Sequence, residues 1–347
     1  MDFQLNCPIP INQYPVITMA HGSGGMLSHQ LIDKMFRPLF DNRLLDEGHD
    51  GAVIESASGR IAFTTDSFVV NPIFFPGGNI GDLAVNGTVN DLACCGARPK
   101  YLSVGMILEE GLPVEDLWKI CLSMQDAASK AGVDIVTGDT KVVEKGHGDK
   151  IYINTSGIGV IPEGVNINPS RTREGDVIII NGQIGDHGVA ILSAREGLGF
   201  ETRITSDTAA LNGLVEQILK ETIKISVLRD PTRGGVATTL NEISTSAGAG
   251  IVLKENSLPV SPEVRGACEV LGLDPLYIAN EGKILVILPA DLAGNVLNTM
   301  KQHPAGADSA IIGRVTSEHP GIVRMITSIG SSRVIDMLTG DQLPRIC

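Results

Sequence analysis

Residues 81–99 read GDLAVNGTVNDLACCGARP, and their apolar spacing predicts a helix. Asp82 begins this predicted helical segment and Asp91 continues it. The other face is apolar and consists of Leu83, Val85, Val89 and Leu92. The stretch therefore predicts a helix that packs against a core on one side and presents acidic groups on the other.

Strand-like runs flank this helix. Residues 61–70, 101–109 and 151–160 are rich in β-branched and apolar side chains, as is typical of strands. Residues 114–131 follow Pro113 and place apolar side chains at helical spacing. Together these segments predict a first α/β unit.

A second unit follows a connector over residues 161–176, which has Pro, Gly and Asn but no periodicity. Its predicted strands and helices are 176–181, 187–197, 284–289, 291–302 and 310–315. The expected fold class is α/β and α+β, with mixed sheets flanked by helices.

Composition fits an enzyme-sized globular protein. The 347 residues are 43% hydrophobic but only 4% aromatic, which indicates aliphatic α/β packing and allows two domains. A formal charge of -13 argues against a nucleic-acid surface. The start MDFQLNCPIP is unlike a signal peptide and no apolar run is long enough to span a membrane, so we expect a cytoplasmic protein without membrane contact.

The six cysteines have no CxxC spacing, which favours neither a disulfide framework nor a zinc site. Cys94 and Cys95 diverge by roughly 100° on a helix, so they cannot chelate one metal, and we expect core thiols. The seven histidines form no HExxH pattern, which also disfavours a zinc enzyme.

A glycine-rich stretch, HGSGGMLSH (21–29), precedes an apolar helical pattern. Its consecutive backbone N–H groups are candidates to bind an anion. An ordinary glycine-rich loop is an equal alternative, because the spacing matches neither GxxxxGK[ST] nor GxGxxG. The predicted contacts are Gly22, Ser23, Gly24 and Gly25.

Four aspartates predict a magnesium site. Asp66 and Asp139 each end a strand-like run, and they join Asp82 and Asp91 as carboxylates flanked by Gly or Thr. One such carboxylate is commonly a turn or cap residue, but four together favour oxygen ligands for Mg²⁺. Since Mg²⁺ is usually held by a few carboxylates plus substrate oxygens, a phosphate ligand follows.

Further nucleotide contacts are predicted around these carboxylates. We assign Thr65, Asn86 and Thr88 to them, whereas Asn90 is either a contact or a helix-surface residue. In the second unit, Asp230 and Arg233 precede a double glycine that opens a helix. This loop suits phosphate binding through Arg233 and free helix N–H groups, although a capped helix with a surface arginine fits equally.

A charged pair, Glu281 and Lys283, precedes the apolar strand at 284–289. Such a pair is ordinarily a solvated turn. The motifs HGSGG, TTDSFVV, GDTKVV, RDPTRGGVATTLNEI, NEGK and a final PRIC, taken with residues 81–99, change this interpretation. Their combination resembles the HypE family of hydrogenase-maturation carbamoyl dehydratases, in the aminoimidazole ribonucleotide synthetase-like ATP-binding superfamily.

The resemblance covers essentially the whole chain. Its middle motifs recur in thiamine monophosphate kinase and selenophosphate synthetase, so they indicate the ATP-binding fold, whereas the final cysteine indicates the family. The implied organisation is a two-domain aminoimidazole ribonucleotide synthetase-like fold. It has an ATP/Mg-binding and dimerisation domain (1–163), an α+β domain (171–338) and a flexible tail (339–347). The cofactors are ATP and Mg²⁺, and the implied assembly is a homodimer.

The resemblance also implies a reaction. A HypF-type carbamoyltransferase loads a carbamoyl group on Cys347, ATP drives its dehydration to S-cyanide, and a HypC–HypD complex accepts the cyanide for a nickel-iron hydrogenase. The metal ligands are implied to be among the four aspartates, with Lys141 and Glu281 around the carbamoyl group. ATP would phosphorylate the amide oxygen, Lys141 would neutralise charge, and Glu281 would remove the nitrogen proton if burial raises its basicity.

The tail suits a carrier role. From the last apolar run at 334–338, the nine residues to Cys347 can extend about 30 Å. The alternatives are an ATP-dependent small-molecule kinase or synthetase and a non-catalytic thiol scaffold. Selenophosphate synthetase chemistry would want a reactive cysteine in a Gly- and Lys-rich loop, whereas Cys7 lies in NCPIP. A prenylation box is excluded because it places the cysteine fourth from the end.

Overall fold

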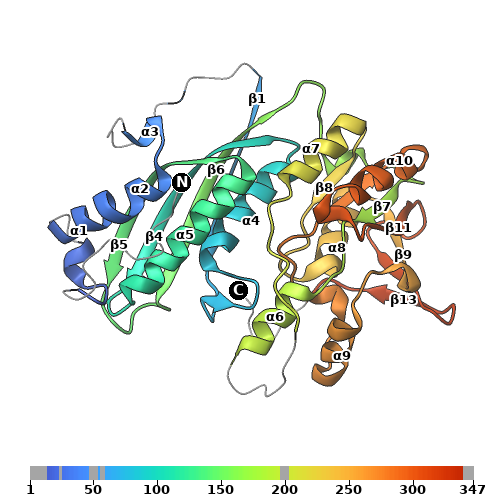
Figure 1. Cartoon of the computed structure of the whole chain (residues 1–347). Coiled ribbons are helices and arrows are strands. Elements are labelled where there is room, and N and C mark those ends of the chain that lie inside the picture. Colours follow the sequence, from blue (N-terminus) through green and yellow to red (C-terminus); the bar gives the residue numbers. More distant parts are fainter. Residues whose placement is uncertain (1–13, 23–25, 47–53, 55–58, 196–202, 339–347) are drawn as a thin grey trace.

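The computed structural model describes residues 14–22, 26–46, 54, 59–195 and 203–338. Two α/β domains lie side by side, the first in blue to green and the second in yellow to red (Figure 1). No helix among the described residues has both the length and the apolar character needed to cross a bilayer. Helix α4 (Ile80–Cys94) lies at the contact between the two domains.

The first domain contains a four-stranded sheet in the order β1-β6-β4-β5. Its strands are β1 (Arg60–Phe68), β4 (Arg98–Glu109), β5 (Asp134–Val143) and β6 (Ile151–Ile161). Only β4 and β5 pair in parallel; β6 is antiparallel to β1 and β4. Helices α4 and α5 (Val114–Ala131) cover one face of this sheet (Figure 1).

Helix α4 begins with a capping box. The Asn79 side chain accepts a hydrogen bond from the Gly81 N–H at 2.8 Å, and Asp82 Oδ1 accepts one from the Asn79 N–H at 2.7 Å. These bonds satisfy two N–H groups that the helix itself cannot pair. A short hairpin, β2 (Phe74–Phe75) and β3 (Gly78–Asn79), leads into this cap.

Short helices at the start of the described chain pack beside β5 (Figure 1). They are η1 (Met19–Gly22), α1 (Met26–Leu31), η2 (Ile32–Phe36), α2 (Arg37–Phe40) and α3 (Arg43–Asp46). The buried side chains of Leu31, Met35 and Leu39 join the core of the first domain.

The second domain contains a seven-stranded sheet in the order β13-β12-β9-β11-β7-β10-β8. Its strands are β7 (Val177–Ile180), β8 (Val227–Arg229), β9 (Gly250–Lys254), β10 (Leu285–Leu288), β11 (Ala310–Thr316), β12 (Val323–Ile326) and β13 (Ser332–Ile335). Its helices are α6 (Asp186–Ala194), α7 (Asn212–Glu221), α8 (Gly235–Ala247), α9 (Pro262–Leu271) and α10 (Ala290–Lys301), with short η3 (Pro169–Arg171), η4 (Glu255–Ser257), η5 (Pro275–Tyr277) and η6 (Pro304–Gly306).

Both faces of this second sheet are buried. Ile179 and Val286 pack in a cluster with α7 and α10, whereas Ile178 and Ile287 pack in a cluster with α8. Strands buried on both sides have continuous apolar sequences, which is how β7 and β10 could be predicted.

The junction between the domains is tied by amide side chains of α4. Asn90 Nδ2 donates to the carbonyl oxygens of Ala209 and Glu281 at 3.0 and 3.2 Å, and Asn90 Oδ1 accepts from the Leu211 N–H at 2.8 Å. Asn86 Nδ2 donates to Thr208 Oγ1 at 3.1 Å. The alternative of a helix-surface Asn90 is wrong, because its side chain is buried and fully hydrogen-bonded.

The predicted fold class and elements are confirmed, with two corrections. Asp66 and Asp139 do not end their strands; both lie within them, since β1 runs to Phe68 and β5 runs to Val143. Cys95 is exposed, not a core thiol, because α4 ends at Cys94 and the chain turns there. The predicted tail, 339–347, lies outside the described residues.

Candidate active site

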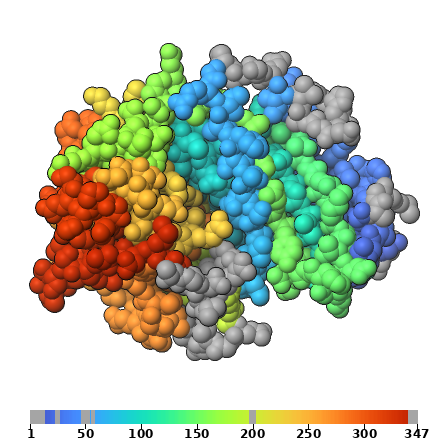
Figure 2. Space-filling view, turned by 180° about the vertical axis from the view of Figure 1, so that it is seen from behind, coloured from blue at the N-terminus to red at the C-terminus, as the bar shows by residue number. Residues whose placement is uncertain are grey.

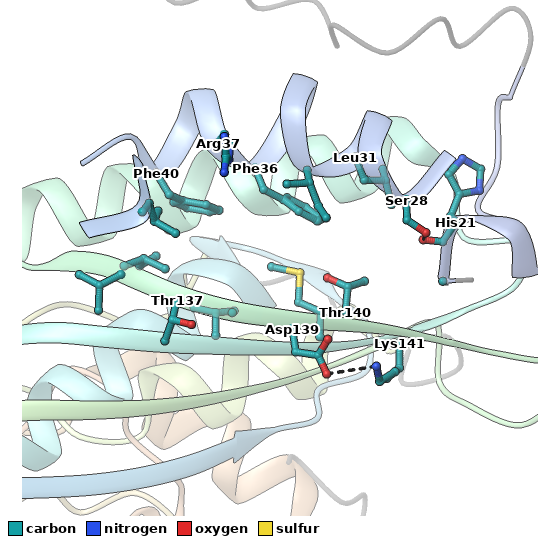
Figure 3. Close-up of a pocket in the computed structure, with 18 of the residues that line it drawn as sticks. His21, Ser28, Leu31, Phe36, Arg37, Phe40, Thr137, Asp139, Thr140 and Lys141 are labelled. Atoms are coloured by element: carbon teal, nitrogen blue, oxygen red, sulfur yellow. Dashed lines mark hydrogen bonds and ion pairs between the residues drawn. The ribbon is translucent and has the colours of Figure 1, made fainter. Parts of the chain in front are cut away.

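Two large cavities contain many of the predicted site residues. The first, here called the β5 cavity, measures about 630 Å³ and lies between the N-terminal helices and β5 (Figure 3). The second, the junction cavity, measures about 810 Å³ and is bounded by β1, α4 and the loop leading into α8. Figure 2 shows the blue segment that contains β1 running between the green strands and the yellow-to-red second domain.

The junction cavity gathers most of the predicted chemistry. Thr65 and Asp66 enter it from β1, Asp91 from α4, and Arg233 and Glu281 from the second domain. These positions are far apart in sequence, and the packing of the two domains against each other brings them together.

Asp91 and Asp66 form the first-domain wall of the cavity. Thr64 Oγ1 donates to Asp91 Oδ2 at 2.8 Å, and the Ser67 N–H donates to Asp66 Oδ1 at 2.8 Å. Burial raises the pKa of both carboxyls, and the charge of Asp66 raises the pKa of Asp91 further. The positive charge of Arg233, which lines the same cavity, opposes these shifts at both residues.

Asp230 and Glu281 form the opposite wall. Burial, reinforced by the charge of Asp91, raises the pKa of Asp230 to about 6. Glu281 is 8% exposed. Burial, and then the charges of Asp207, Asp230 and Asp66, raise the pKa of Glu281 well above its usual range. The cavity is therefore a partly desolvated cluster of like charges that a cation would relieve.

Glu281 is held from its backbone. Its N–H donates to Asp207 Oδ1 at 3.1 Å, and its carbonyl accepts from Asn90 Nδ2 at 3.2 Å. Asp207 Oδ2 in turn lies 2.8 Å from Lys283 Nζ, in an ion pair that is almost fully buried. The expectation of a solvated turn at Glu281 and Lys283 is thus wrong, because Asp207 supplies a buried partner that lies 76 residues away.

The entry to α8 depends on two glycines. Gly234 and Gly235 have φ values of 72° and 60°, in the left-handed region that other residues rarely adopt. A Cβ at Gly235 would lie 2.5 Å from the Leu276 carbonyl oxygen. Only glycine fits this approach, which places Arg233 and the first turn of α8 against the cavity.

Two of the four predicted metal ligands, Asp82 and Asp139, lie away from the junction cavity. Asp82 caps the start of α4, nine residues before Asp91, so the two carboxylates are separated by roughly 13 Å along the helix axis. Asp139 is on β5 and Asp66 on β1, at opposite edges of the sheet and roughly 14 Å apart at ordinary strand spacing. The four aspartates of one chain therefore lie in three places. Asp66 and Asp91 line the junction cavity, Asp139 lines the β5 cavity, and Asp82 caps α4.

The β5 cavity contains the other predicted contacts. Figure 3 shows Phe36 and Phe40 of the N-terminal helices facing Asp139, Thr140 and Lys141 of β5 across it. Lys141 Nζ lies 3.4 Å from Asp139 Oδ2, with both side chains well exposed. Gly22 also lines this cavity, whereas Ser23, Gly24 and Gly25 lie outside the described residues, as does Cys347.

Two predicted nucleotide contacts lie inside the molecule. Thr88 is fully buried and its hydroxyl lies 2.5 Å from that of Thr155, joining α4 to β6. Asn86 is buried and bonded to Thr208. Both side chains therefore bind other parts of the protein, and neither one lines either of the two cavities.

The donor set of the junction cavity fits magnesium that arrives with a phosphate. Among the described residues, no group of three or more His, Cys, Asp or Glu side chains is arranged to surround a metal ion. Asp66 and Asp91 supply two carboxylates on one wall, and Mg²⁺ is usually held by one or two carboxylates plus substrate phosphates. A site built wholly from protein ligands does not fit.

Sequence reasoning missed Asp207 and Thr64 as site-building residues. Asp207 follows a loop without periodicity, and Thr64 is one of two adjacent threonines on β1, so no local pattern marks either one. Asp230 was visible in the RDPTRGG motif, but only the structure shows that it is partly buried near Asp91 and Cys94.

The matches to known families follow the two domains. Residues 48–161 match the family described as AIR synthase related protein, N-terminal domain, and residues 173–326 match its C-terminal domain. The fold and the site thus define an AIR synthase related protein. Within this class, the chain belongs to the HypE family of carbamoyl dehydratases, as the following similarities show.

A relative named carbamoyl dehydratase HypE, from Azotobacter vinelandii, is 53% identical over 331 residues, which is 95% of this chain and 97% of the relative. A crystal structure of the hydrogenase maturation protein HypE in complex with ATP is 50% identical with a TM-score of 0.91, over 95% of this chain and 99% of that one. The structure of a HypE–HypF complex contains a chain that is 51% identical with a TM-score of 0.79, over 89% of this chain and 99% of that one. The predicted family is confirmed.

A more distant similarity concerns the fold alone. Thiamine monophosphate kinase from Aquifex aeolicus has a TM-score of 0.57 but only 21% identity, over 89% of this chain and 99% of the kinase. The two proteins therefore share a fold, and this similarity contains no information about the substrate of this chain.

Proposed function

We propose that this chain is an ATP-dependent carbamoyl dehydratase that converts an S-carbamoyl group on Cys347 into S-cyanide for nickel-iron hydrogenase maturation. Its membership of the HypE family, and relatives named carbamoyl dehydratase, support this proposal. The observation that supports it most strongly in the structure is Glu281, a buried carboxyl with a raised pKa on the wall of a cavity that also contains Asp66, Asp91 and Arg233.

The reaction needs an activated oxygen, because an amide oxygen is a poor leaving group. The carbamoyl oxygen attacks the γ-phosphorus of ATP, ADP leaves, and the nitrogen gives up one proton, forming an O-phosphorylated imidate. The imidate then loses its second nitrogen proton to a base as the C–O bond breaks and phosphate departs. The products are S-cyanide, ADP and phosphate, so the oxygen of the carbamoyl group leaves on the phosphate.

The junction cavity supplies groups for both steps. Arg233 and the first turn of α8 would bind phosphate oxygens, while Asp66 and Asp91 would hold Mg²⁺. When bound, this ion supplies charge neutralisation to the phosphates. Glu281 is assigned as the base for the nitrogen proton, because burial and neighbouring carboxylates raise its affinity for a proton.

The β5 cavity is part of the proposal as a nucleotide-contacting surface. Lys141 and Asp139 bear charge at its polar side, and Gly22 lies beside them. Lys141 is assigned to the neutralisation of phosphate charge during transfer. Asp82, Asn86 and Thr88 have structural partners in this chain, so their predicted contacts with the nucleotide or metal stay predictions.

A homodimer is also part of the proposal. Ile61 and Phe63 of β1 and Ile107 of β4 are 52%, 69% and 43% exposed, on a sheet whose other face is buried. Exposed apolar side chains gathered on one sheet are typical of a protein interface. This face supports pairing between the first domains of two chains.

The proposed partners follow from the reaction. A HypF-type carbamoyltransferase would load Cys347, and a HypC–HypD complex would accept the cyanide. The solved HypE–HypF complex supports the first of these partners. We also propose a cytoplasmic location, since Cys94, Cys95 and Cys268 are free thiols, as is typical of a reducing compartment.

Mass spectrometry of the intact chain tests the activity. The chain is incubated with a HypF-type carbamoyltransferase, carbamoyl phosphate and ATP. We expect a carbamoyl mass on Cys347, followed by loss of one water only when Mg-ATP is present. Phosphorylation of a free metabolite with an unmodified Cys347 would instead establish the small-molecule kinase alternative.

Cys347→Ala is the matched variant for this experiment. It should bind ATP with unchanged affinity and form no S-cyanide, because only the acceptor atom is removed. Continued S-cyanide formation by this variant would show that another thiol is the carrier.

A further inference from the structure

We propose that Asn280 and Asn90 are positioning residues, which hold Glu281 at a fixed place relative to the groups that bind phosphate and metal. This inference rests on the proposed function and deepens it by naming the residues that set the geometry of its base. The two asparagines are 0% and 2% exposed, and neither lines the junction cavity or the β5 cavity. Both therefore act through other residues and do not touch the substrate.

Asn280 connects the base to the loop that precedes α8. It directly precedes Glu281 in the chain, and its Nδ2 donates to the carbonyl oxygens of Pro231 and Ile278 at 2.8 and 3.0 Å. Pro231 lies between β8 and α8, in the same loop as Arg233, which lines the junction cavity. The amide thus joins the segment that bears the base to the loop that would bind phosphate oxygens.

The start of helix α6 holds the same segment. Asn280 Oδ1 accepts a hydrogen bond from the N–H of Gly185, the N-cap residue of α6, at 2.8 Å. The Gly188 N–H, in the first turn of that helix, donates to the Ala279 carbonyl oxygen at 3.2 Å. The backbone just before Glu281 is therefore fixed at two consecutive residues.

Helix α8 approaches this segment without an intervening side chain. A Cβ at Gly235 would lie 2.6 Å from the Ile278 carbonyl oxygen, a distance that real Cβ atoms do not adopt. The first turn of α8 and the segment before Glu281 thus pack backbone against backbone. A shift of one of them cannot be absorbed by a side chain between them.

Asn90 connects the base to the first domain. It directly precedes Asp91 on α4, and its Nδ2 donates to the Glu281 carbonyl oxygen at 3.2 Å and to that of Ala209 at 3.0 Å. Its Oδ1 accepts from the Leu211 N–H at 2.8 Å. One side chain therefore links the residue after it, a proposed metal ligand, to the backbone of the proposed base.

Both asparagines use their amides in the same way. Each donates from Nδ2 to two carbonyl oxygens and accepts from one backbone N–H, so the amide is paired on both its nitrogen and its oxygen. Because a buried polar group without a partner costs free energy, such an amide favours a single arrangement of the three backbone groups around it. An aspartate would lack the donors, and an alanine would lack all three bonds.

The proposed reaction depends on this arrangement. The base must reach the nitrogen proton while the carbamoyl oxygen is bonded to phosphorus, so the separation between Glu281 and the phosphate site decides the rate. A misplacement of about 1 Å can slow an enzyme by about 10²-fold. The two asparagines fix that separation from both domains, without adding charge to the nucleotide site.

A double-mutant cycle in the full-length chain tests the proposal. Asn280→Ala is made in the wild-type chain and in Glu281→Gln, and Asn90→Ala is made in the same two backgrounds. Each protein is carbamoylated on Cys347 and mixed with Mg-ATP, and the single-turnover rate of S-cyanide formation is measured. Calorimetry gives the Mg-ATP affinity, and urea denaturation and circular dichroism show that each variant is folded.

We expect each alanine variant to react about 10–100-fold more slowly in the wild-type background, with unchanged Mg-ATP affinity. In the Glu281→Gln background the same substitutions should change the rate by less than about twofold, because the base through which they act is already absent. A merely structural role would slow both backgrounds by the same factor and would overturn the proposal. A wild-type rate in a folded alanine variant would overturn it as well.

Thr208→Val is the matched control. It removes the acceptor of the Asn86 amide, which is another bond between α4 and the second domain, and leaves the bonds of Asn90 and Asn280 in place. This variant should react at the wild-type rate. A loss as large as that of Asn90→Ala would show that any bond at the junction has this effect, which would contradict a specific role for the two asparagines.

Two further outcomes are separable. If Asn280→Ala does not fold, Asn280→Ser, which keeps a hydroxyl donor, takes its place in the cycle. A near-normal rate in Glu281→Gln alone would overturn the proposal, because the base would be another group. A wild-type chain that forms no S-cyanide would instead overturn the proposed function, so the two failures are distinguishable.

Discussion

Lys283 Nζ lies 2.8 Å from Asp207 Oδ2, and the two side chains are only 11% and 5% exposed. Asp207 also accepts a hydrogen bond from the Glu281 N–H. Burial is the largest single influence and raises the pKa of Asp207, but the charge and hydrogen bond of Lys283, the charge of His187 and the bond from the Glu281 N–H together outweigh it, so that this pKa lies below its usual value. A buried ion pair thus fixes the backbone of the candidate base.

Removing one partner of this pair should destabilise the protein strongly. Asp207→Asn leaves the Lys283 charge buried without a counterion, which typically costs about 3–5 kcal/mol. Urea denaturation at pH 7 would measure the fall in the free energy of unfolding. The double variant Asp207→Asn/Lys283→Met is the control, and it should recover much of the loss because no uncompensated charge remains. Equal stability of the two variants would show that the pair is not the cause.

Glu281→Gln tests the assignment of the base. The substitution keeps the size of the side chain and removes its ability to take a proton, so S-cyanide formation should fall by about 10²–10⁴-fold. ATP affinity, measured by calorimetry, should be retained, since the amide keeps the size of the side chain and adds no charge to the cavity. A near-normal rate would exclude Glu281 as the base.

The sequence predicted local structure better than it predicted the site. The periodicity of residues 114–131 predicted α5, and the apolar runs predicted β1, β4 and β6, because these signals are contained within each segment. Whether Asp82 and Asp91 meet one ligand depends instead on the length of α4, which separates them. The number of aspartates in this part of the sequence does not show how far apart their carboxylates lie in the fold.

Burial of the catalytic candidate was also beyond local reasoning. Glu281 and Lys283 have the sequence pattern of a solvated turn, and only Asp207, from a distant loop, makes their burial possible. Family resemblance singled out Glu281, whereas the physical reason for its raised pKa comes from packing between two domains.

The two aspartates of α4 should respond differently to substitution. Asp91→Asn removes a carboxylate from the junction cavity and should weaken Mg-ATP binding by about tenfold or more, as expected for a lost metal ligand contact. Calorimetric titration with Mg-ATP measures this change. Unchanged affinity would remove Asp91 from the proposed metal site.

Asp82→Ala is the matched substitution at the other end of the helix. It removes the N-terminal capping bond to Asn79, so it should lower the free energy of unfolding by about 1 kcal/mol. Its Mg-ATP affinity should stay at the wild-type value. A loss of affinity as large as that of Asp91→Asn would place Asp82 in the nucleotide site despite its cap.

Asp230 should make the protein without nucleotide or metal less stable as pH rises. Its pKa is raised from 3.8 to about 6, so between these values the folded state binds more protons than the unfolded state. Stability therefore falls as pH rises through this window, and the loss is complete above pH 6. Asp230→Asn should remove this pH dependence and stabilise the protein at pH 7 by about 1–2 kcal/mol. This value is smaller than the free energy that corresponds to the whole pKa shift, because neighbouring carboxylates share the repulsion. Urea denaturation in the presence of a chelator, at pH 4 and at pH 7, would measure it. If Asp230→Asn stabilised the protein no more at pH 7 than at pH 4, the pKa of Asp230 would not be raised by its surroundings.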